Sequence, residues 1–223
     1  MTPTSLPREN EQPADSSLVE IRLATPDDRR GVYELRYQVY AEELGQHSRN
    51  AEGVLRNDLD DFNEYVIALQ GGELVGFVSI TPPGHARYSL DGYLPRSEWP
   101  FPVTDSLYEI RLLTVSPEHR GGWLSGALMY AALRYIEAQG GREIMATGRR
   151  EVASIYRRVG LREHGIEIQS GQVTYLLMSA STAEIRARID GMEAFVQRFR
   201  RALDWRMGVA FESPQRKGNA ADE

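Results

Sequence analysis

The stretch Val115-Ser-Pro-Glu-His-Arg-Gly-Gly-Trp-Leu-Ser-Gly-Ala-Leu128 lies near the middle of this 223-residue chain and joins two segments of different periodicity. Residues 107–115 form a run typical of a strand, whereas residues 120–138 carry apolar side chains at helical spacing. Gly140 and Gly141 end that helix, and residues 143–147 predict another short strand. The stretch is therefore the turn of a strand, helix, strand crossover.

Three strands and a helix are predicted before this crossover. Residues 18–23 alternate apolar and polar side chains as a strand does, and Thr25-Pro26-Asp27-Asp28 is typical of a helix start. That helix is expected to run to about Leu44, because Gly45 follows. The clearest hairpin lies in residues 64–69 and 74–80, around the turn Gln70-Gly71-Gly72-Glu73.

A short helix and a second strand pair are predicted after the crossover. Residues 151–159 read as a helix ended by Gly160, and residues 161–168 and 173–178 read as strands. The element order is then β, α, ββ, long loop, β, α, β, α, ββ. This order indicates an α/β fold of the α+β type, in which helices flank one sheet.

The end of the chain carries a heptad-like apolar stripe. Its members are spaced alternately by four and three residues: Ile185, Ile189, Met192, Val196, Phe199 and Leu203. This spacing predicts one amphipathic helix within residues 181–211. The stripe covers fewer than three heptads, so packing on its own domain and a subunit contact in a homodimer are equally compatible with it.

Composition divides the chain into four parts. Residues 1–17 are predicted to be a disordered leader, residues 18–180 one domain, residues 181–211 the terminal helix, and residues 212–223 a disordered tail. The leader has no apolar run, which argues against a signal peptide or membrane span. We therefore expect a cytoplasmic location.

Residue counts exclude several kinds of site. Without cysteine, the chain has no disulfide, no thiolate nucleophile and no zinc site that needs sulfur ligands. The four histidines lie far apart in sequence, so no metal site is expected. The net charge of -6 argues against general nucleic-acid binding, although residues 142–206 hold 12 arginines against 8 acidic residues. Lys217 is the only lysine, so an anion site must use arginine or backbone N–H groups.

The crossover and element order resemble the GNAT superfamily of acyl-transferring enzymes over about residues 18–180. The family has Arg/Gln-x-x-Gly-x-Gly/Ala at the helix start, which Arg120, Gly121 and Gly122 fit. Trp123 stands where a motif glycine is expected, so its indole is expected to crowd the phosphate approach, and Ser125 stands where Gly or Ala is expected. The resemblance implies a mixed, mostly antiparallel sheet flanked by helices, here with an extra C-terminal helix.

In this family, backbone N–H groups at the helix start bind the pyrophosphate of coenzyme A. The central strand and the next strand are expected to part after Val115, where a bulge near residues 113–115 polarises the thioester carbonyl. The likeness therefore implies these donor-binding residues: Leu113, Thr114, Val115, Arg120, Gly121, Gly122, Trp123, Leu124, Ser125 and Ser154.

The front half is similar to acyl-homoserine-lactone synthases and N-acyl amino acid synthases. The likeness rests on residues 35–44, Asp58-Leu-Asp-Asp61 ahead of Tyr65-Val-Ile-Ala68, and Glu109-Ile-Arg111. These GNAT relatives commonly take acyl groups from an acyl carrier protein. The likeness implies acyl-CoA or carrier-bound acyl-phosphopantetheine as the donor, with no tightly bound cofactor. The arginine-rich residues 142–206 would suit the acidic face of a carrier.

Glu109 and Arg111 are expected on the same face of the central strand, because they are two residues apart. By resemblance, Glu109 is the general base that removes a proton from the acceptor ammonium. The alternatives are a structural ion pair with Arg111 or the binding of a charged acceptor.

Tyr156 lies in a segment that matches the family's Tyr-x-x-x-Gly-Phe/Leu pattern. By resemblance its phenol protonates the departing thiolate, and Ser154 hydrogen-bonds the donor arm. The alternative is a core tyrosine that packs on an apolar helix face with Val152 and Val159.

Further polar residues are candidates for the acceptor pocket, which the proline-rich loop of residues 82–102 is expected to cover. They are Arg36, Tyr40, Asp61, Ser79, Arg111 and Arg149, although Arg149 would also suit a donor phosphate.

These observations predict an N-acyltransferase with a thioester donor and a small-molecule amine acceptor. A transferase that uses aminoacyl-tRNA would also explain the altered loop, but it conflicts with the acidic net charge. The third alternative is a non-catalytic GNAT-fold binding module.

Overall fold

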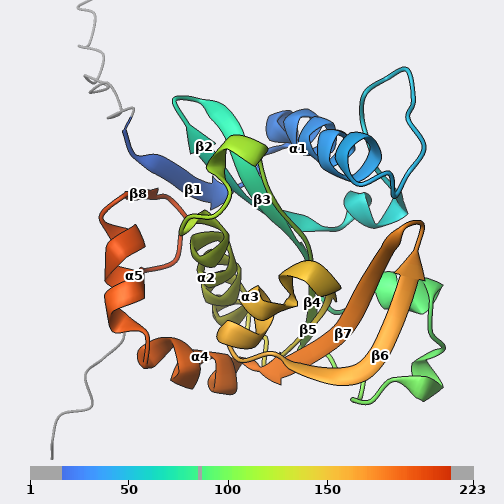
Figure 1. Cartoon of the computed structure of the whole chain (residues 1–223). Coiled ribbons are helices and arrows are strands. Elements are labelled where there is room, and N and C mark those ends of the chain that lie inside the picture. Colours follow the sequence, from blue (N-terminus) through green and yellow to red (C-terminus); the bar gives the residue numbers. More distant parts are fainter. Residues whose placement is uncertain (1–16, 85–86, 212–223) are drawn as a thin grey trace, which may run out of the picture.

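An eight-stranded mixed sheet runs through the molecule in the computed structural model, which describes residues 17–84 and 87–211 (Figure 1). The predicted leader and tail lie outside these residues, apart from Ser17. The strand order is β6-β7-β5-β4-β3-β2-β1-β8. Within the described residues only the pairs β4 with β5 and β1 with β8 are parallel, so the predicted mixed, mostly antiparallel sheet is confirmed. The strands are β1 Val19–Leu23, β2 Glu64–Gln70, β3 Glu73–Thr81, β4 Leu107–Val115, β5 Glu143–Arg149, β6 Arg162–Ser170, β7 Val173–Ser181 and β8 Leu203–Trp205.

Helices cover both faces of this sheet. Helix α1 (Arg29–Tyr37) packs Val32 and Leu35 against Tyr65, Ile67 and Phe77 on one face. Helix α2 (Leu124–Ala138) lies on the opposite face, where the larger apolar core gathers (Figure 1). The alternation of side chains along each strand supplies both faces, because Tyr65 and Ile67 of β2 point to α1 while Val66 and Ala68 join the core under α2.

The first helix confirms the predicted start and end, with a change of geometry inside it. A 3-10 turn at Pro26–Asp28 leads into α1, and the Asp28 carboxylate accepts a hydrogen bond from the backbone N–H of Thr25 at 2.6 Å. After Tyr37 the helix continues as a π-helix over Gln38–Glu43. Gly45, with φ 60°, then ends it.

Helix α2 begins later than predicted. The sequence places its start at Arg120, but Pro117–His119 form a 3-10 turn and Gly121 has a φ of 76°. A left-handed residue cannot continue a right-handed helix, so the first regular residue is Leu124. Residues 120–123 therefore form a loop in front of the helix.

The prediction of a single terminal helix is wrong. The chain forms α4 (Thr182–Asp190) and α5 (Glu193–Arg200) with a break at Gly191 and Met192, and then pairs β8 with β1. The stripe residues Ile185, Ile189, Val196 and Phe199 are buried in the main core. In the chain, the stripe therefore packs on its own domain. The remaining helix, α3 (Ala153–Arg158), connects β5 to β6.

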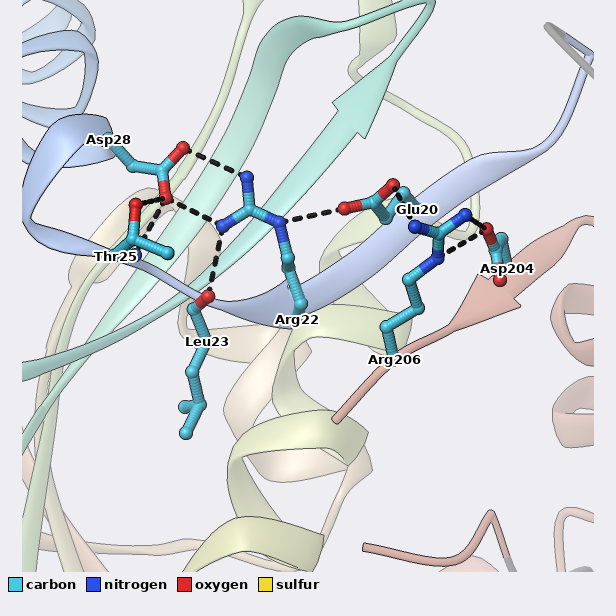
Figure 2. Close-up of polar contacts among 7 residues, drawn as sticks. All are labelled: Glu20, Arg22, Leu23, Thr25, Asp28, Asp204 and Arg206. Atoms are coloured by element: carbon cyan, nitrogen blue, oxygen red, sulfur yellow. Dashed lines mark hydrogen bonds and ion pairs between the residues drawn. The ribbon is translucent and has the colours of Figure 1, made fainter. Parts of the chain in front are cut away.

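Charged side chains join β8 to β1 and to the start of α1 (Figure 2). Arg22 donates to both carboxylate oxygens of Asp28, at 2.6 and 2.9 Å, and to Glu20 at 2.7 Å. Arg206 pairs with Asp204 at 2.6 Å and with Glu20 at 3.5 Å. The network spans two ends of the chain, so it supports the short parallel pairing of β8.

In the part of the chain that the structure describes, no helix is both long and apolar enough to cross a membrane.

Candidate active site

The parallel strands β4 and β5 stay paired for only part of their length. Their register runs from Leu107 opposite Glu143 to Ile110 opposite Ala146, and neither strand pairs with the other beyond that point. On the other side of β4, Phe77 pairs with Thr114 and Ser79 with Arg111, which leaves one extra residue on β4. The sheet therefore splits between β4 and β5.

The extra residue is a bulge at Leu112, which has a φ of 54°. This left-handed conformation is strained for a branched side chain and turns the backbone of β4 away from β5. The prediction that the strands part after Val115 was wrong in position, because the parting starts after Ile110. Beyond the bulge, residues 113–115 have no pairing partner on the β5 side, and they line the opening there.

A first cavity, here called the α2 cleft, opens where the strands part. It is lined by residues 113–115 of β4, by the loop in front of α2 and by residues of the first helix and of α3. Most of the predicted donor-binding residues meet here: Leu113, Thr114, Val115, Arg120, Gly121, Gly122 and Ser125.

Three predicted donor-binding residues do not line the α2 cleft. The Trp123 indole packs against the main core, so the expected crowding of the loop does not occur. Leu124 is buried in the same core. Ser154 is exposed, and its neighbours Ile155 and Tyr156 line the cleft in its place, because successive helix residues point in different directions.

Glu43 lies in the α2 cleft and was missed by the sequence analysis. Its two carboxylate oxygens accept hydrogen bonds from Arg120 at 2.6 and 2.7 Å, and Arg120 also donates to the Val115 carbonyl at 3.0 Å. The Arg120 guanidinium holds the pKa of the Glu43 carboxyl below its usual range. The cationic side chain of the loop is thus paired with an acid from the π-helix.

A second cavity, here called the β7 pocket, adjoins the first. It is lined by residues from the first helix and its following loop, from β4, β5, α3, β6 and β7, and by Ser89 and Tyr93 of the proline-rich loop. Hydrogen bonds among the lining side chains and Ser170 stabilise the pocket. The Tyr175 hydroxyl donates to Gln46 at 2.6 Å. The Gln46 amide and the Tyr93 hydroxyl donate to the Ser170 hydroxyl at 3.1 and 3.2 Å. Of the loop of residues 82–102, which was expected to cover the pocket, Ser89 in the 3-10 turn Ser89–Gly92 and the following Tyr93 line it, and residues 85–86 lie outside the described part.

Five residues line both cavities and so mark where they meet: Tyr40, Leu113, Arg149, Val152 and Tyr156. Tyr156 is 3% exposed, and burial raises the pKa of its phenol well above the usual range, with Tyr40 adding to the effect and Arg149 opposing it. The phenol therefore stays protonated at neutral pH. The ring lies against Gly148 of β5, which has no side chain to displace it.

Glu109 is fully buried and lines neither cavity. Its carboxylate accepts hydrogen bonds from the backbone N–H of Ser89, at 2.8 Å, and from the Ser89 hydroxyl. Among the residues that the structure describes, it forms no ion pair with Arg111. Ser89 lies between Glu109 and the β7 pocket. The sequence analysis did not identify Ser89, because the loop around it has no periodicity.

The predicted acceptor residues fall into two groups. Tyr40, Arg111 and Arg149 line the β7 pocket. Arg36 is buried against Asp60, with Nη1 at 3.0 and 3.2 Å from its carboxylate oxygens, and Ser79 accepts a hydrogen bond from Asn63 at 3.1 Å. These two, like the exposed Asp61, line neither cavity. The neighbouring Asp60 takes the buried position, and it also accepts a hydrogen bond from Tyr65 at 2.6 Å.

Comparison with protein families identifies the fold. The sequence matches the model of the acetyltransferase (GNAT) family over residues 29–161, and the chain belongs to that family. The fold is thus a GNAT fold, and the protein is an acyltransferase. Comparison with curated proteins found no match.

Solved structures share this fold at low sequence identity. BjaI, a CoA-dependent acyl-homoserine lactone synthase solved with SAM and isopentyl-CoA, superimposes with a TM-score of 0.69 at 17% identity, over 87% of this chain and 95% of its own. The AHL synthase LasI gives 0.65 at 16% identity, over 78% and 94%. A putative N-acetyltransferase from Lactobacillus plantarum gives 0.56 at 18% identity, over 74% and 99%.

Proposed function

We propose that this protein is an N-acyltransferase that moves an acyl group from a thioester donor to the amine of a small-molecule acceptor by direct attack. The observation that carries the proposal is the position of Tyr156, which lines both cavities where they meet beside the split of β4 and β5. A buried, protonated phenol at such a junction suits the step in which a thiolate leaves.

The α2 cleft is the proposed donor site. Peptide N–H groups of residues 113–115 lie where β4 has left β5, and they would polarise the thioester carbonyl. The loop at Gly121 and Gly122 carries no side chains that block its peptide groups, and it precedes the N-terminus of α2, which favours a phosphate. Acyl-CoA and a carrier-bound acyl-phosphopantetheine both supply this chemistry.

The β7 pocket is the proposed acceptor site. The amine nitrogen attacks the thioester carbon, forms the C–N bond and gives a tetrahedral intermediate whose collapse breaks the C–S bond. The amine proton passes through the Ser89 hydroxyl to the Glu109 carboxylate, along the hydrogen bond that joins them. Tyr156 gives its proton to the departing sulfur. Glu109 thereby keeps the role of base that the resemblance implies, although it acts through Ser89.

Three features bear on the alternatives. The open α2 cleft, with Trp123 packed away from it, supports catalysis over a non-catalytic binding module. The solved complex of BjaI with isopentyl-CoA supports a CoA donor in a protein of the same fold. The arginine-rich second half of the chain supports a carrier-protein donor.

The test is a donor and acceptor screen on the full chain. Acetyl-CoA, longer acyl-CoAs, acyl-loaded carrier protein and aminoacyl-tRNA are each mixed with a panel of amines, while free thiol release and amide mass are recorded. We expect amide formation in step with thiol release, and we expect Tyr156→Phe to lower it. Thiol release without any amide, or amide formation only from aminoacyl-tRNA, would refute the proposal.

A further inference from the structure

Arg149, the last residue of β5, brings a positive charge to the junction of the two cavities. Of the five residues that line both the α2 cleft and the β7 pocket, the other four are two tyrosines, a leucine and a valine. The Arg149 side chain is partly exposed, and within residues 17–84 and 87–211 it makes no hydrogen bond or ion pair. Its guanidinium is therefore available to a group of the substrate.

The arginines closest to Arg149 in the cleft and in the chain are paired. Arg120 holds both carboxylate oxygens of Glu43, at 2.6 and 2.7 Å, and Arg150 pairs with Glu167. Glu43 is the only carboxylate among the described residues that line the two cavities. The fold thus leaves the cation at the junction without a carboxylate partner.

The charge of Arg149 acts on groups from three sides of the junction. Burial raises the pKa of the Tyr156 phenol on α3 and of the Tyr175 phenol on β7, and the charge of Arg149 opposes both rises. Hydrogen bonds from Arg120 lower the pKa of the Glu43 carboxyl on the π-helix, and the charge of Arg149 adds to this effect. An anion that forms at the junction is stabilised by the same charge.

The leaving group of the proposed reaction is such an anion, and Tyr156 alone is a weak acid for it. A thiol like that of cysteine has a pKa of about 8.5, whereas burial raises the pKa of the Tyr156 phenol above the usual value of about 10. Transfer of the phenolic proton to the thiolate is therefore uphill. Negative charge must rest on the sulfur or on the phenolate while the C–S bond breaks, and a fixed cation stabilises either anion.

We propose that Arg149 is a catalytic residue on the leaving-group side, whose guanidinium stabilises the thiolate that forms when the C–S bond breaks. This inference rests on the proposed function. The electron pair of the broken bond stays on the sulfur, within reach of the guanidinium. Tyr156 gives its proton to this thiolate, and the phenolate that remains regains a proton from solvent water. The donor then leaves as a free thiol.

The experiment measures the pKa of a bound donor thiol, so it needs no acceptor. The chain has no cysteine, and bound CoA or phosphopantetheine therefore supplies the only thiol. Thiolate absorbance in the ultraviolet is followed against pH in the full chain, with the desulfo form of each ligand as the blank for tyrosine ionisation. Arg149→Gln and Arg149→Met remove the charge, and Arg149→Lys keeps it. Arg150→Gln is the matched control, because Arg150 is exposed and lines neither cavity.

The other ionisable groups around the bound thiol stay the same in all these proteins, so a difference between variants reports residue 149. These groups are Tyr40, Glu43, Tyr93, Arg111, His119, Arg120, Tyr156 and Tyr175. We expect the thiol pKa to be about 1 to 3 units lower in the wild type and the control than in Arg149→Gln and Arg149→Met. Arg149→Lys should lie close to the wild type, and the affinity for desulfo-CoA should change little.

Acyl transfer gives an independent readout with any acceptor that the screen supplies. Acyl-CoA releases an alkyl thiol, whereas an acyl 4-nitrothiophenyl ester releases a much more acidic aromatic thiol that needs little stabilisation. We expect Arg149→Gln to lower kcat with acyl-CoA by about 10²- to 10³-fold and to slow the aromatic thioester far less. A merely structural role of Arg149 would slow both donors equally.

Different outcomes separate this inference from the proposed function. An equal thiol pKa in the wild type and Arg149→Gln, or equal slowing of both donors, would overturn the inference and leave the proposed function intact. Equal loss of affinity for CoA and desulfo-CoA, with the thiol pKa unchanged, would place Arg149 on a donor phosphate and overturn it as well. A lowered thiol pKa without amide formation from any amine would refute the proposed function while confirming that Arg149 stabilises a thiolate. Absence of binding by either thiol would refute both. If Arg149→Gln does not fold, Arg149→Met and Arg149→Lys decide.

Discussion

Gly148 lies directly against the ring of Tyr156, so that a β-carbon at position 148 would stand 2.9 Å from ring carbon Cε2. Carbon atoms do not approach so closely, so Gly148→Ala forces the tyrosine to move. We expect kcat to fall at least tenfold, with a loss of about 1–3 kcal/mol in the free energy of unfolding. Steady-state kinetics and thermal denaturation measure both. Gly92→Ala is the control, because nothing lies within 4 Å of its β-carbon position; equal activity of both variants would contradict the assigned role of Tyr156.

Tyr156→Phe removes the proposed acid and keeps the ring. We expect kcat to fall about 10²- to 10⁴-fold, while the affinity for a donor thioester stays within a few-fold of the wild type. Because burial raises the pKa of the phenol above its usual range, Tyr156 stays protonated through neutral and mildly alkaline pH. The wild-type rate should therefore show no loss from Tyr156 ionisation between pH 7 and roughly pH 9. A Phe variant as fast as the wild type would place the acid elsewhere.

Ser89→Ala interrupts the path between the β7 pocket and Glu109. We expect this variant and Glu109→Gln to lower kcat/KM by similar factors, and their double variant to add little, because both groups act in one relay. Ser154→Ala is the matched control, since Ser154 is exposed and lines neither cavity. Strictly additive losses would argue against the relay.

Glu43→Gln frees Arg120 in the α2 cleft. The bidentate pair is about two-fifths exposed, so its effect on stability should stay below about 1 kcal/mol. A free guanidinium attracts phosphate, and we expect Kd for CoA to fall several-fold at low salt, with the gain shrinking as salt is raised. Glu42→Gln, an exposed neighbour, serves as control. Unchanged or weaker CoA binding in Glu43→Gln would show that the pair does not compete with the donor.

Asp28→Asn tests the charge network of Figure 2. Hydrogen bonds from Arg22 hold the pKa of the Asp28 carboxyl well below its usual range in the folded state. A lowered folded pKa means that the carboxylate stabilises the fold above its unfolded pKa of about 4, and that this stabilisation fades as pH falls below it. We expect Asp28→Asn to lower the free energy of unfolding by about 1 kcal/mol at pH 7 and by much less near pH 2.5, as urea titrations would measure. A constant difference across pH would contradict the network.

The strands and the crossover were predictable from sequence because each depends on local periodicity. The hairpin around Gly71 and Gly72 and the strand at residues 107–115 are confirmed. The start of α2 was missed because the left-handed Gly121 sits inside an apparently helical pattern. The break at Gly191 was missed because the apolar stripe continues across it, so spacing alone could not show the break.

The site was only partly predictable, for a different reason. Tyr40, Arg111, Arg149 and Tyr156 meet in the cavities because recognisable strands and helices carry them there. Ser89 reaches the site through a loop that has no sequence period. Glu43 was missed although it lies in the same π-helix as Tyr40, because the sequence does not show that its side chain points into the site. Asp60 is the buried acid and Asp61 is exposed, and only the fold decides which of two adjacent carboxylates points inward.

The parallel pairing of β8 with β1 has a consequence for synthesis. On the outer side of β1, residues 19–21 pair with residues 203–205 of β8. A nascent chain therefore leaves this edge of the sheet unpaired until almost all of the domain has been synthesised. Residues of α4 and α5 that pack in the main core, and β8 against the first strand, can take their places only after that point.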